Sequence, residues 1–109
     1  MTVKLEQIQV GFAKYIDNEL GAKATGLTKF MVYFATPSIQ NMLKVKINEY
    51  RSNPLFSDMF DDKGDIKLED TYKRAKEAIS KSGKILIPQI NYFADEQDLE
   101  LLFNYIKNA

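Results

Sequence analysis

The sequence predicts an α+β fold that is mostly α-helical, with about four to five helices and a small C-terminal β-hairpin before the last helix. Apolar residues recur at three- and four-residue intervals over most of the chain, which is the spacing of one helical face. Only Lys84–Phe93, KILIPQINYF, is rich in isoleucine and aromatic residues in the way that is typical of strands. A chain of 109 residues can bury one core without disulfides, so we expect a single domain over residues 1–109.

The first predicted element is an amphipathic helix over Val3–Leu20. We expect Gly21 to end it, and the short connector over residues 22–26 indicates an antiparallel pairing with the next helix. Its apolar face consists of Leu5, Ile8, Phe12, Tyr15, Ile16 and Leu20.

The stretch Gly26–Tyr50 holds the densest apolar run in the chain and is the expected core element. Its first part, Leu27–Ala35, is apolar nearly all round, and such a helix is enclosed by its own protein, covered by a partner or placed in lipid. After Pro37 the pattern narrows to a single apolar stripe. Proline suits the first turn of a helix but kinks a helix interior, so two alternatives stay open: one long kinked helix, or two helices in tandem.

Large apolar side chains crowd the segment that follows Pro54. We interpret this segment as a helical turn that plugs the core, in preference to an exposed docking patch, because large apolar side chains are usually buried. The side chains concerned are Leu55, Phe56, Met59 and Phe60.

The acidic stretch Asp61–Asp70 invites comparison with a calcium-binding loop. If Gly64 takes the glycine position of such a loop, Met59 and Lys63 fall at ligand positions, and neither side chain offers an oxygen. We therefore predict a tight turn with Gly64 in the left-handed conformation. A weaker hypothesis places metal binding or carboxylate-based catalysis on the acids of this region. These acids are Asp58, Asp61, Asp62 and Asp65.

The next predicted helix runs over Leu68–Ser82, with Gly83 just past its end as a C-terminal cap. Lysine and arginine residues make one side of this helix basic, but acidic residues are interleaved with them and the whole chain has a formal net charge of +0. We favour a solvated face over a nucleic-acid site, so no nucleic-acid partner is predicted.

The expected β component follows this helix. We predict that Ile85–Ile87 pairs with Ile90–Tyr92 around a turn at Pro88, because proline cannot donate a ladder hydrogen bond. One bent strand is the alternative reading of Lys84–Phe93. Two alternatives stay open here: a two-stranded hairpin, or three short strands with the third supplied by the segment around Ile66, which would stabilise the hairpin.

The last helix is predicted to start after Asp95, a good N-cap residue, with Glu96 and Asp98 in its first turn. Leu101 and Tyr105 lie on the side opposite its apolar stripe and are candidates for an oligomer or partner surface. The stripe consists of Leu99, Leu102, Phe103 and Ile106.

Composition narrows the function classes. The chain has no cysteine and no histidine, so disulfides, thiolate chemistry and cysteine-ligated zinc are excluded, and the commonest general base is missing. We therefore expect no enzymatic activity, no cofactor and no metal. The N-terminal residues lack the basic-then-apolar layout of a secretory signal, and the longest uncharged run, Phe30–Met42, is too short to span a bilayer, so we expect a cytoplasmic protein.

Several short motifs accompany this order of elements: a D-x-G-D-I turn, an I-x-I-P strand, and a terminal D-x-x-D-L helix that ends in YIKNA. In this layout the chain resembles small uncharacterised proteins encoded in phages and prophages of Gram-positive bacteria. The resemblance covers most of the chain and implies a small accessory or assembly role. It carries no active site to transfer.

Our main hypothesis is a non-enzymatic protein–protein interaction or assembly module that self-associates or binds a protein partner. The large aromatic and methionine content, in a chain with no chemistry-bearing cluster, favours this function. The alternative is a peripheral membrane protein that inserts the apolar helix around residues 27–35 into a bilayer interface. The candidate interaction surface consists of Phe30, Tyr33, Phe34, Phe56, Met59, Leu101 and Tyr105.

Overall fold

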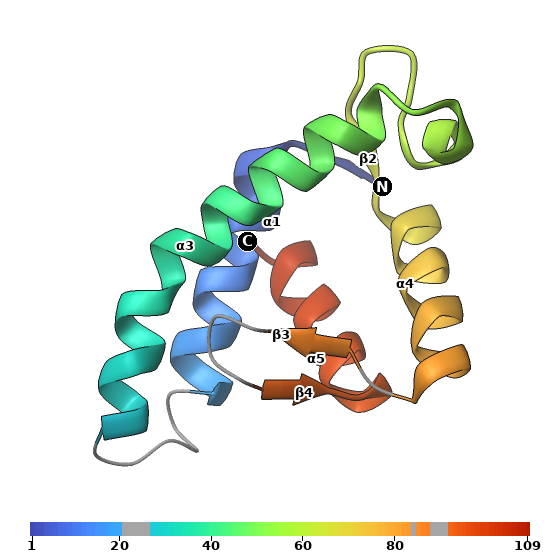
Figure 1. Cartoon of the computed structure of the whole chain (residues 1–109). Coiled ribbons are helices and arrows are strands. Elements are labelled where there is room, and N and C mark those ends of the chain that lie inside the picture. Colours follow the sequence, from blue (N-terminus) through green and yellow to red (C-terminus); the bar gives the residue numbers. More distant parts are fainter. Residues whose placement is uncertain (21–26, 84, 88–91) are drawn as a thin grey trace.

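The computed structural model describes the backbone of residues 1–20, 27–83, 85–87 and 92–109, and the side chains of residues 1–19, 36–83 and 95–109. The long helix α3 (Leu27–Arg51) lies across α1 (Leu5–Tyr15), α4 (Leu68–Ser82) stands on the opposite side, and α5 (Glu96–Lys107) lies between them (Figure 1). Among the helices in these ranges, none is both long and apolar enough to cross a bilayer.

The most extensive contact between the described helices joins α1 to α5. Gly11 lies directly against Ile106 there, since a Cβ added to Gly11 would stand 2.5 Å from Ile106 Cα. Gln7 crosses the same contact, and its Nε2 donates a hydrogen bond to the carbonyl oxygen of Ile106 at 2.9 Å. Glycine at position 11 therefore lets the two backbones approach more closely than a larger residue would allow.

The pairing of the first two helices is as predicted. Past Tyr15, helix α1 continues as a π-helix, η1 (Ile16–Leu20), and α1 runs antiparallel to α3 (Figure 1). Gln9 Nε2 donates to the carbonyl oxygen of Gln40 at 3.0 Å, and Gln40 Nε2 donates to that of Gln9 at 3.3 Å. The connector between the helices lies outside the described residues. Helix α3 is continuous through Pro37, so the alternative of two tandem helices is wrong.

The predicted fold class is wrong in its β component. Near the N-terminus, β1 (Thr2–Val3) pairs antiparallel with β2 (Ile66–Lys67), a sheet that the sequence pattern does not indicate. Ile66 lies opposite Val3, so it does not add a third strand to a C-terminal hairpin. Val3 stays in this strand, and the first helix begins only at Leu5.

A separate two-stranded antiparallel sheet joins β3 (Ile85–Ile87) to β4 (Tyr92–Ala94), with Ile87 opposite Tyr92. The expected partner segment, Ile90–Tyr92, is therefore displaced, because β4 begins where that segment was predicted to end. Residues 88–91, which include Pro88 and the predicted turn, lie outside the described residues. The corrected fold is a mostly helical chain that carries two separate two-stranded sheets within the described ranges, in place of one C-terminal hairpin.

Local signals fix the ends of the later helices. Helix α4 has the predicted bounds, and Gly83 caps it with a φ of 80°. At the start of α5, the backbone N–H of Asp98 donates to Asp95 Oδ1 at 3.0 Å, and the backbone N–H of Asp95 donates to Asp98 Oδ2 at 3.1 Å. This reciprocal capping satisfies two backbone groups that the first helical turn leaves open. The predicted turn at Gly64 is confirmed, again with a φ of 80°.

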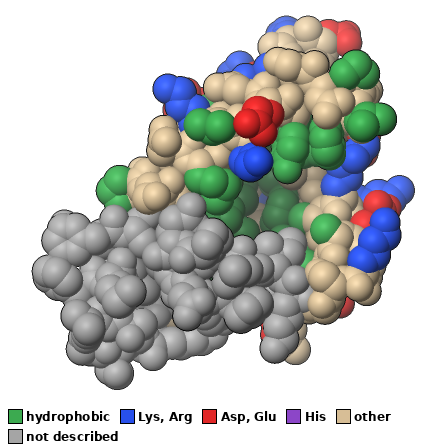
Figure 2. All heavy atoms as spheres, viewed as in Figure 1, with side chains coloured by type: hydrophobic (Ala, Val, Ile, Leu, Met, Phe, Trp, Pro, Cys, Tyr) green, Lys and Arg blue, Asp and Glu red, His purple; other side chains and the backbone are tan. Residues whose placement is uncertain are grey.

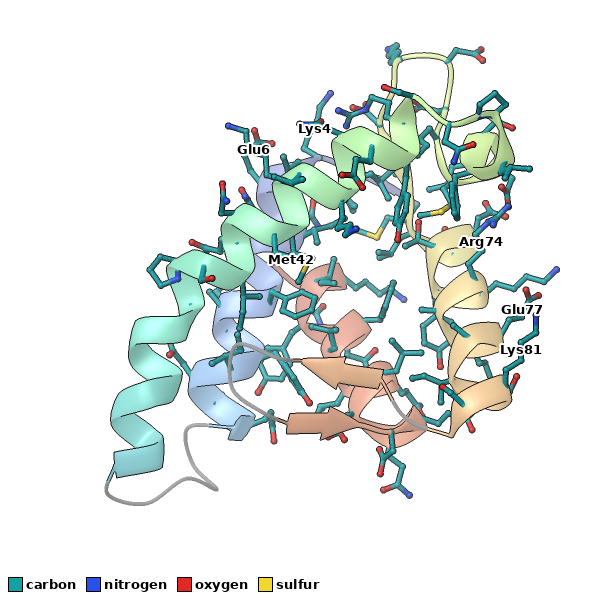
Figure 3. The ribbon with its side chains drawn as sticks, viewed as in Figure 1. Lys4, Glu6, Met42, Arg74, Glu77 and Lys81 are labelled. Atoms are coloured by element: carbon teal, nitrogen blue, oxygen red, sulfur yellow. The ribbon has the colours of Figure 1, made fainter. Side chains whose placement is uncertain are left out.

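The core gathers side chains from α1, η1, α3, α4, α5 and the N-terminal sheet, and Met42 points from α3 toward α5 (Figure 3). Val3 and Ile66 of the N-terminal sheet belong to the core, so this sheet closes one end of it. The buried cluster consists of Val3, Ile8, Tyr15, Ile16, Ile39, Ile47, Ile66, Leu68, Leu102 and Ile106.

Candidate functional site

A surface groove separates α4 from α5 over part of their length. Its volume is about 310 Å³. The floor is apolar, and the aromatic rings of Tyr72 and Phe103 meet there edge to face, with their centroids 5.0 Å apart. Polar and charged side chains form the rim. The lining residues are Leu68, Glu69, Tyr72, Glu100, Phe103, Asn104 and Lys107.

Helical spacing explains how the sequence builds this groove. Leu68 and Tyr72 are four residues apart on α4 and therefore share one face. On α5, Phe103 lies at the edge of the buried stripe, and Asn104 and Lys107 follow it on the flank that faces solvent. On each helix, the apolar side chain at the edge of the buried face thus forms part of the groove floor. The polar side chains next to it form the rim.

The two carboxylates of the rim, Glu69 and Glu100, differ in their contacts within the described part of the chain: the first is paired and the second is not. Glu69 accepts two hydrogen bonds from the N-terminal ammonium of Met1, at 3.0 Å and 2.8 Å. These bonds hold the pKa of the Glu69 carboxyl below its usual range, and the positive charge of Lys107 adds a smaller effect in the same direction. Glu100, by contrast, forms no ion pair with another described residue. It is exposed and is free to pair with a group on a partner.

The 3-10 helix η2 (Pro54–Met59) lies past the N-terminal end of α4 (Figure 1) and presents an apolar side chain to solvent. Leu55 is 75% exposed, the highest value among the large hydrophobic side chains of the described residues. We call residues 53–58, which carry it, the Leu55 turn. The prediction of a core plug holds for Met59, which is buried, but not for Leu55.

Arg74 of α4 binds the Leu55 turn through several hydrogen bonds. Its guanidinium donates to the carbonyl oxygen of Leu55 at 2.6 Å, and its Nε donates to both carboxylate oxygens of Asp58 at 3.0 and 3.1 Å. The same group lies over the ring of Phe56, 4.9 Å from its centroid. The hydrogen bond to Arg74 lowers the pKa of Asp58, and the bond to Asp58 raises the pKa of Arg74.

Further contacts complete this anchoring. The side-chain oxygen of Asn53 accepts a hydrogen bond from the backbone N–H of Leu55 at 3.0 Å. The ring of Phe56 packs on Tyr50 of α3, with the centroids 4.3 Å apart. The turn is therefore tied to both α3 and α4, and the backbone of Leu55 is held by hydrogen bonds at its N–H and its carbonyl oxygen.

The structure separates the predicted interaction residues. Met59 is buried, and Phe56 is half-buried between Tyr50 and Arg74. Leu101 and Tyr105 are half-buried on α5 and pack against the core at a different place. The side chains of the remaining candidates lie outside the described residues, although their backbone belongs to α3. These candidates are Phe30, Tyr33 and Phe34.

Tyr105 belongs to a pair of tyrosines beside the π-helix. Its hydroxyl donates to Glu19 Oε1 at 2.8 Å, and this bond, with burial, raises the pKa of Tyr105. Tyr15 lies edge to face with it, the ring centroids 6.1 Å apart, and the Tyr15 hydroxyl donates to Asp98 Oδ1 at 3.1 Å. Both hydroxyls are thus committed to carboxylates within the fold.

Of the four acidic residues considered for metal binding or catalysis, Asp62 is exposed and the other three are engaged in structural contacts. Asp58 pairs with Arg74, and Asp65 pairs with Lys4 at 2.6 Å. Asp61 Oδ1 accepts hydrogen bonds from the backbone N–H groups of residues 63 and 65 at 3.0 and 2.8 Å, which shapes the turn. Within the described part of the chain, no three acidic side chains gather into a group that could hold a metal ion.

No protein-family model, no curated protein and no solved structure matches the chain. The side chains described above therefore carry the functional argument. Sequence reasoning missed the groove because it assigned Phe103 to the apolar stripe of the last helix and did not relate it to Tyr72 on the preceding helix. A bulky aromatic residue at the border of each apolar stripe is the signal that could have indicated it.

Proposed function

We propose that the protein is a non-enzymatic protein-binding module, with an accessory or assembly role, that takes an apolar side chain of a protein partner into the α4–α5 groove. The observation that carries this proposal is an open groove with an aromatic floor and a charged rim. The resemblance to phage and prophage proteins supports an assembly role of this kind.

The geometry of the groove suits a partner side chain. Its volume of about 310 Å³ is at the lower end of pockets that enclose small molecules, so it fits one or two side chains. Burying an aliphatic side chain on the Tyr72–Phe103 floor contributes roughly 1.5–3 kcal/mol. Ion pairs between the partner and rim groups such as Glu100 and Lys107 fix the position of the partner and its specificity more than they raise its affinity. Figure 2 shows hydrophobic side chains and charged side chains close together around a hollow on one face of the described region.

Selection of peptides tests this proposal. We would select binders from a random peptide library and map the bound peptides by amide chemical shifts of the isotope-labelled protein. We expect the selected peptides to share an apolar residue, and the largest shifts to fall on the groove residues of α4 and α5. Shifts centred elsewhere would contradict the proposal.

Two tryptophan variants provide the matched comparison. Asn104 has an exposed side chain on the groove wall, so Asn104→Trp fills the groove without disturbing the core. Glu77 lies on the outer side of α4 together with Arg74 and Lys81 (Figure 3), so Glu77→Trp adds the same side chain outside the groove. Peptide binding should weaken about 10-fold or more in the first variant, the loss expected when one aliphatic contact is removed, and stay unchanged in the second.

A further inference from the structure

The Leu55 turn has the properties of a preformed binding element. Its apolar side chain is exposed, and its backbone is held by Arg74 and Asn53. A backbone that is already held in position loses little conformational freedom on binding, so the ordering of this turn costs little affinity. The other exposed large hydrophobic side chains of the described residues, Met1, Val10 and Val45, are less exposed, at 51%, 43% and 47%.

Charges beside the two elements are complementary. Arg51 adjoins the turn, because its neighbour Tyr50 packs on Phe56. The Arg51 guanidinium donates to the carbonyl oxygen of Gly64 at 3.1 Å and to Asn48 Oδ1 at 2.8 Å, but it forms no ion pair within the described ranges. An uncompensated cation thus accompanies the turn. On the groove rim, Glu100 is the anion that forms no ion pair among the described residues, and Lys107 lies elsewhere on the same rim.

The turn cannot enter the groove of its own molecule. Arg74, which binds the turn, and Glu69, which lines the groove, are five residues apart on α4. At 3.6 residues per turn they lie roughly 140° apart around the helix axis. In Figure 1, η2 lies past the N-terminal end of α4, whereas α5 lies beside α4 toward the centre of the molecule. The element and its receptor therefore face different directions.

We infer that the partner is a second copy of this chain, whose Leu55 enters the α4–α5 groove and joins the molecules head to tail. This inference rests on the proposed function and names its partner. Because the two surfaces differ, the contact is heterologous, and each added molecule leaves one turn and one groove open. The product is a ring if the rotation closes and a filament if it does not.

Complementation between two variants tests this inference. Leu55→Glu removes the apolar side chain but keeps the groove, and Asn104→Trp fills the groove but keeps the turn. In analytical ultracentrifugation we expect the wild type to grow in mass with concentration, and each variant alone to stay at the monomer mass of 12.5 kDa. An equimolar mixture should form a complex of twice that mass, because one molecule supplies the turn and the other supplies the groove.

Matched controls are available at exposed positions. Val45→Glu places the same charge on another exposed aliphatic residue, 47% exposed, and Glu77→Trp adds tryptophan outside the groove; both should associate as the wild type does. Leu55→Ala should raise the dissociation constant about 10- to 100-fold, which corresponds to losing one buried leucine side chain. Circular dichroism would confirm that each variant is folded.

Three results would overturn the inference: a wild type that stays monomeric, an association that survives Leu55→Glu, or a mixture of the variants that fails to pair. A monomeric wild type whose groove still binds selected apolar peptides leaves the proposed function standing. If neither peptides nor a second copy occupies the groove, both fail.

Discussion

Replacing Gly11 with alanine tests the closest contact of the fold, because helix propensity and packing predict opposite results. Alanine in place of a helical glycine stabilises a helix by about 1 kcal/mol. The new Cβ, however, would stand 2.5 Å from Ile106 Cα and 2.8 Å from Ile106 N. These are backbone atoms of α5, so the helix as a whole has to move.

The magnitude follows from the groups that would move. Overpacking a core costs about 1–3 kcal/mol. Separating the helices also weakens the hydrogen bond from Gln7 to Ile106, which contributes about 1 kcal/mol. After subtraction of the propensity gain, we expect Gly11→Ala to lower the free energy of unfolding by about 1–3 kcal/mol.

Urea denaturation followed by circular dichroism measures this change. Val10→Ala is the control, because Val10 is a neighbouring residue on α1 that is 43% exposed, so alanine there raises helix propensity without a clash. A Gly11→Ala protein as stable as the wild type, or more stable, would show that α1 and α5 are not in backbone contact at this position.

Other predictions concern single contacts. Gly83→Ala should lower stability by about 1 kcal/mol because φ is 80° there, and Gly83→Asn, measured in the same urea series, should lose less. The pKa of Asp58 is lowered in the folded state, so its ion pair stabilises the protein above the ordinary value of 3.8 and this contribution disappears as the pH falls through the lowered pKa. The stability difference between wild type and Arg74→Met should therefore shrink in acid, and a difference that stays constant with pH in thermal denaturation would refute the assignment. In a phenolate absorbance titration, Tyr105 should ionise above the ordinary pKa of 10.0, and Glu19→Gln should bring that pKa down; an unchanged titration curve would exclude the hydrogen bond.

Local chemistry explains which parts of the fold were predictable. The cap at Asp95, the glycine at position 83 and the turn at Gly64 depend on residues within a few positions of each other, and all three were predicted from the sequence. The pairing of Val3 with Ile66 was not, because nothing near either residue in the sequence identifies so distant a partner.

Exposure was harder to predict than helix position. The pattern around Leu55 indicated burial, but the contacts of Arg74 hold the turn with Leu55 exposed, whereas Met59 is buried and Phe60 packs against the core. The groove combines the edges of two apolar stripes from different helices, so neither stripe alone reveals it. The periodicity of a single sequence shows which face of each helix is apolar. It does not show where the apolar faces of two packed helices separate and leave a groove between them.

The packing of α1 against α5 has a consequence for synthesis in the cell. The first helix of the chain completes its main interface only with the last described one, so α1 cannot bury its Gly11 face until α5 has left the ribosome. Contacts between residues so far apart in sequence also form slowly, since the intervening chain must close a long loop. We expect the nascent chain to stay without a completed core until α5 has emerged from the ribosome, and its vulnerability to proteases and aggregation to be greatest in that interval.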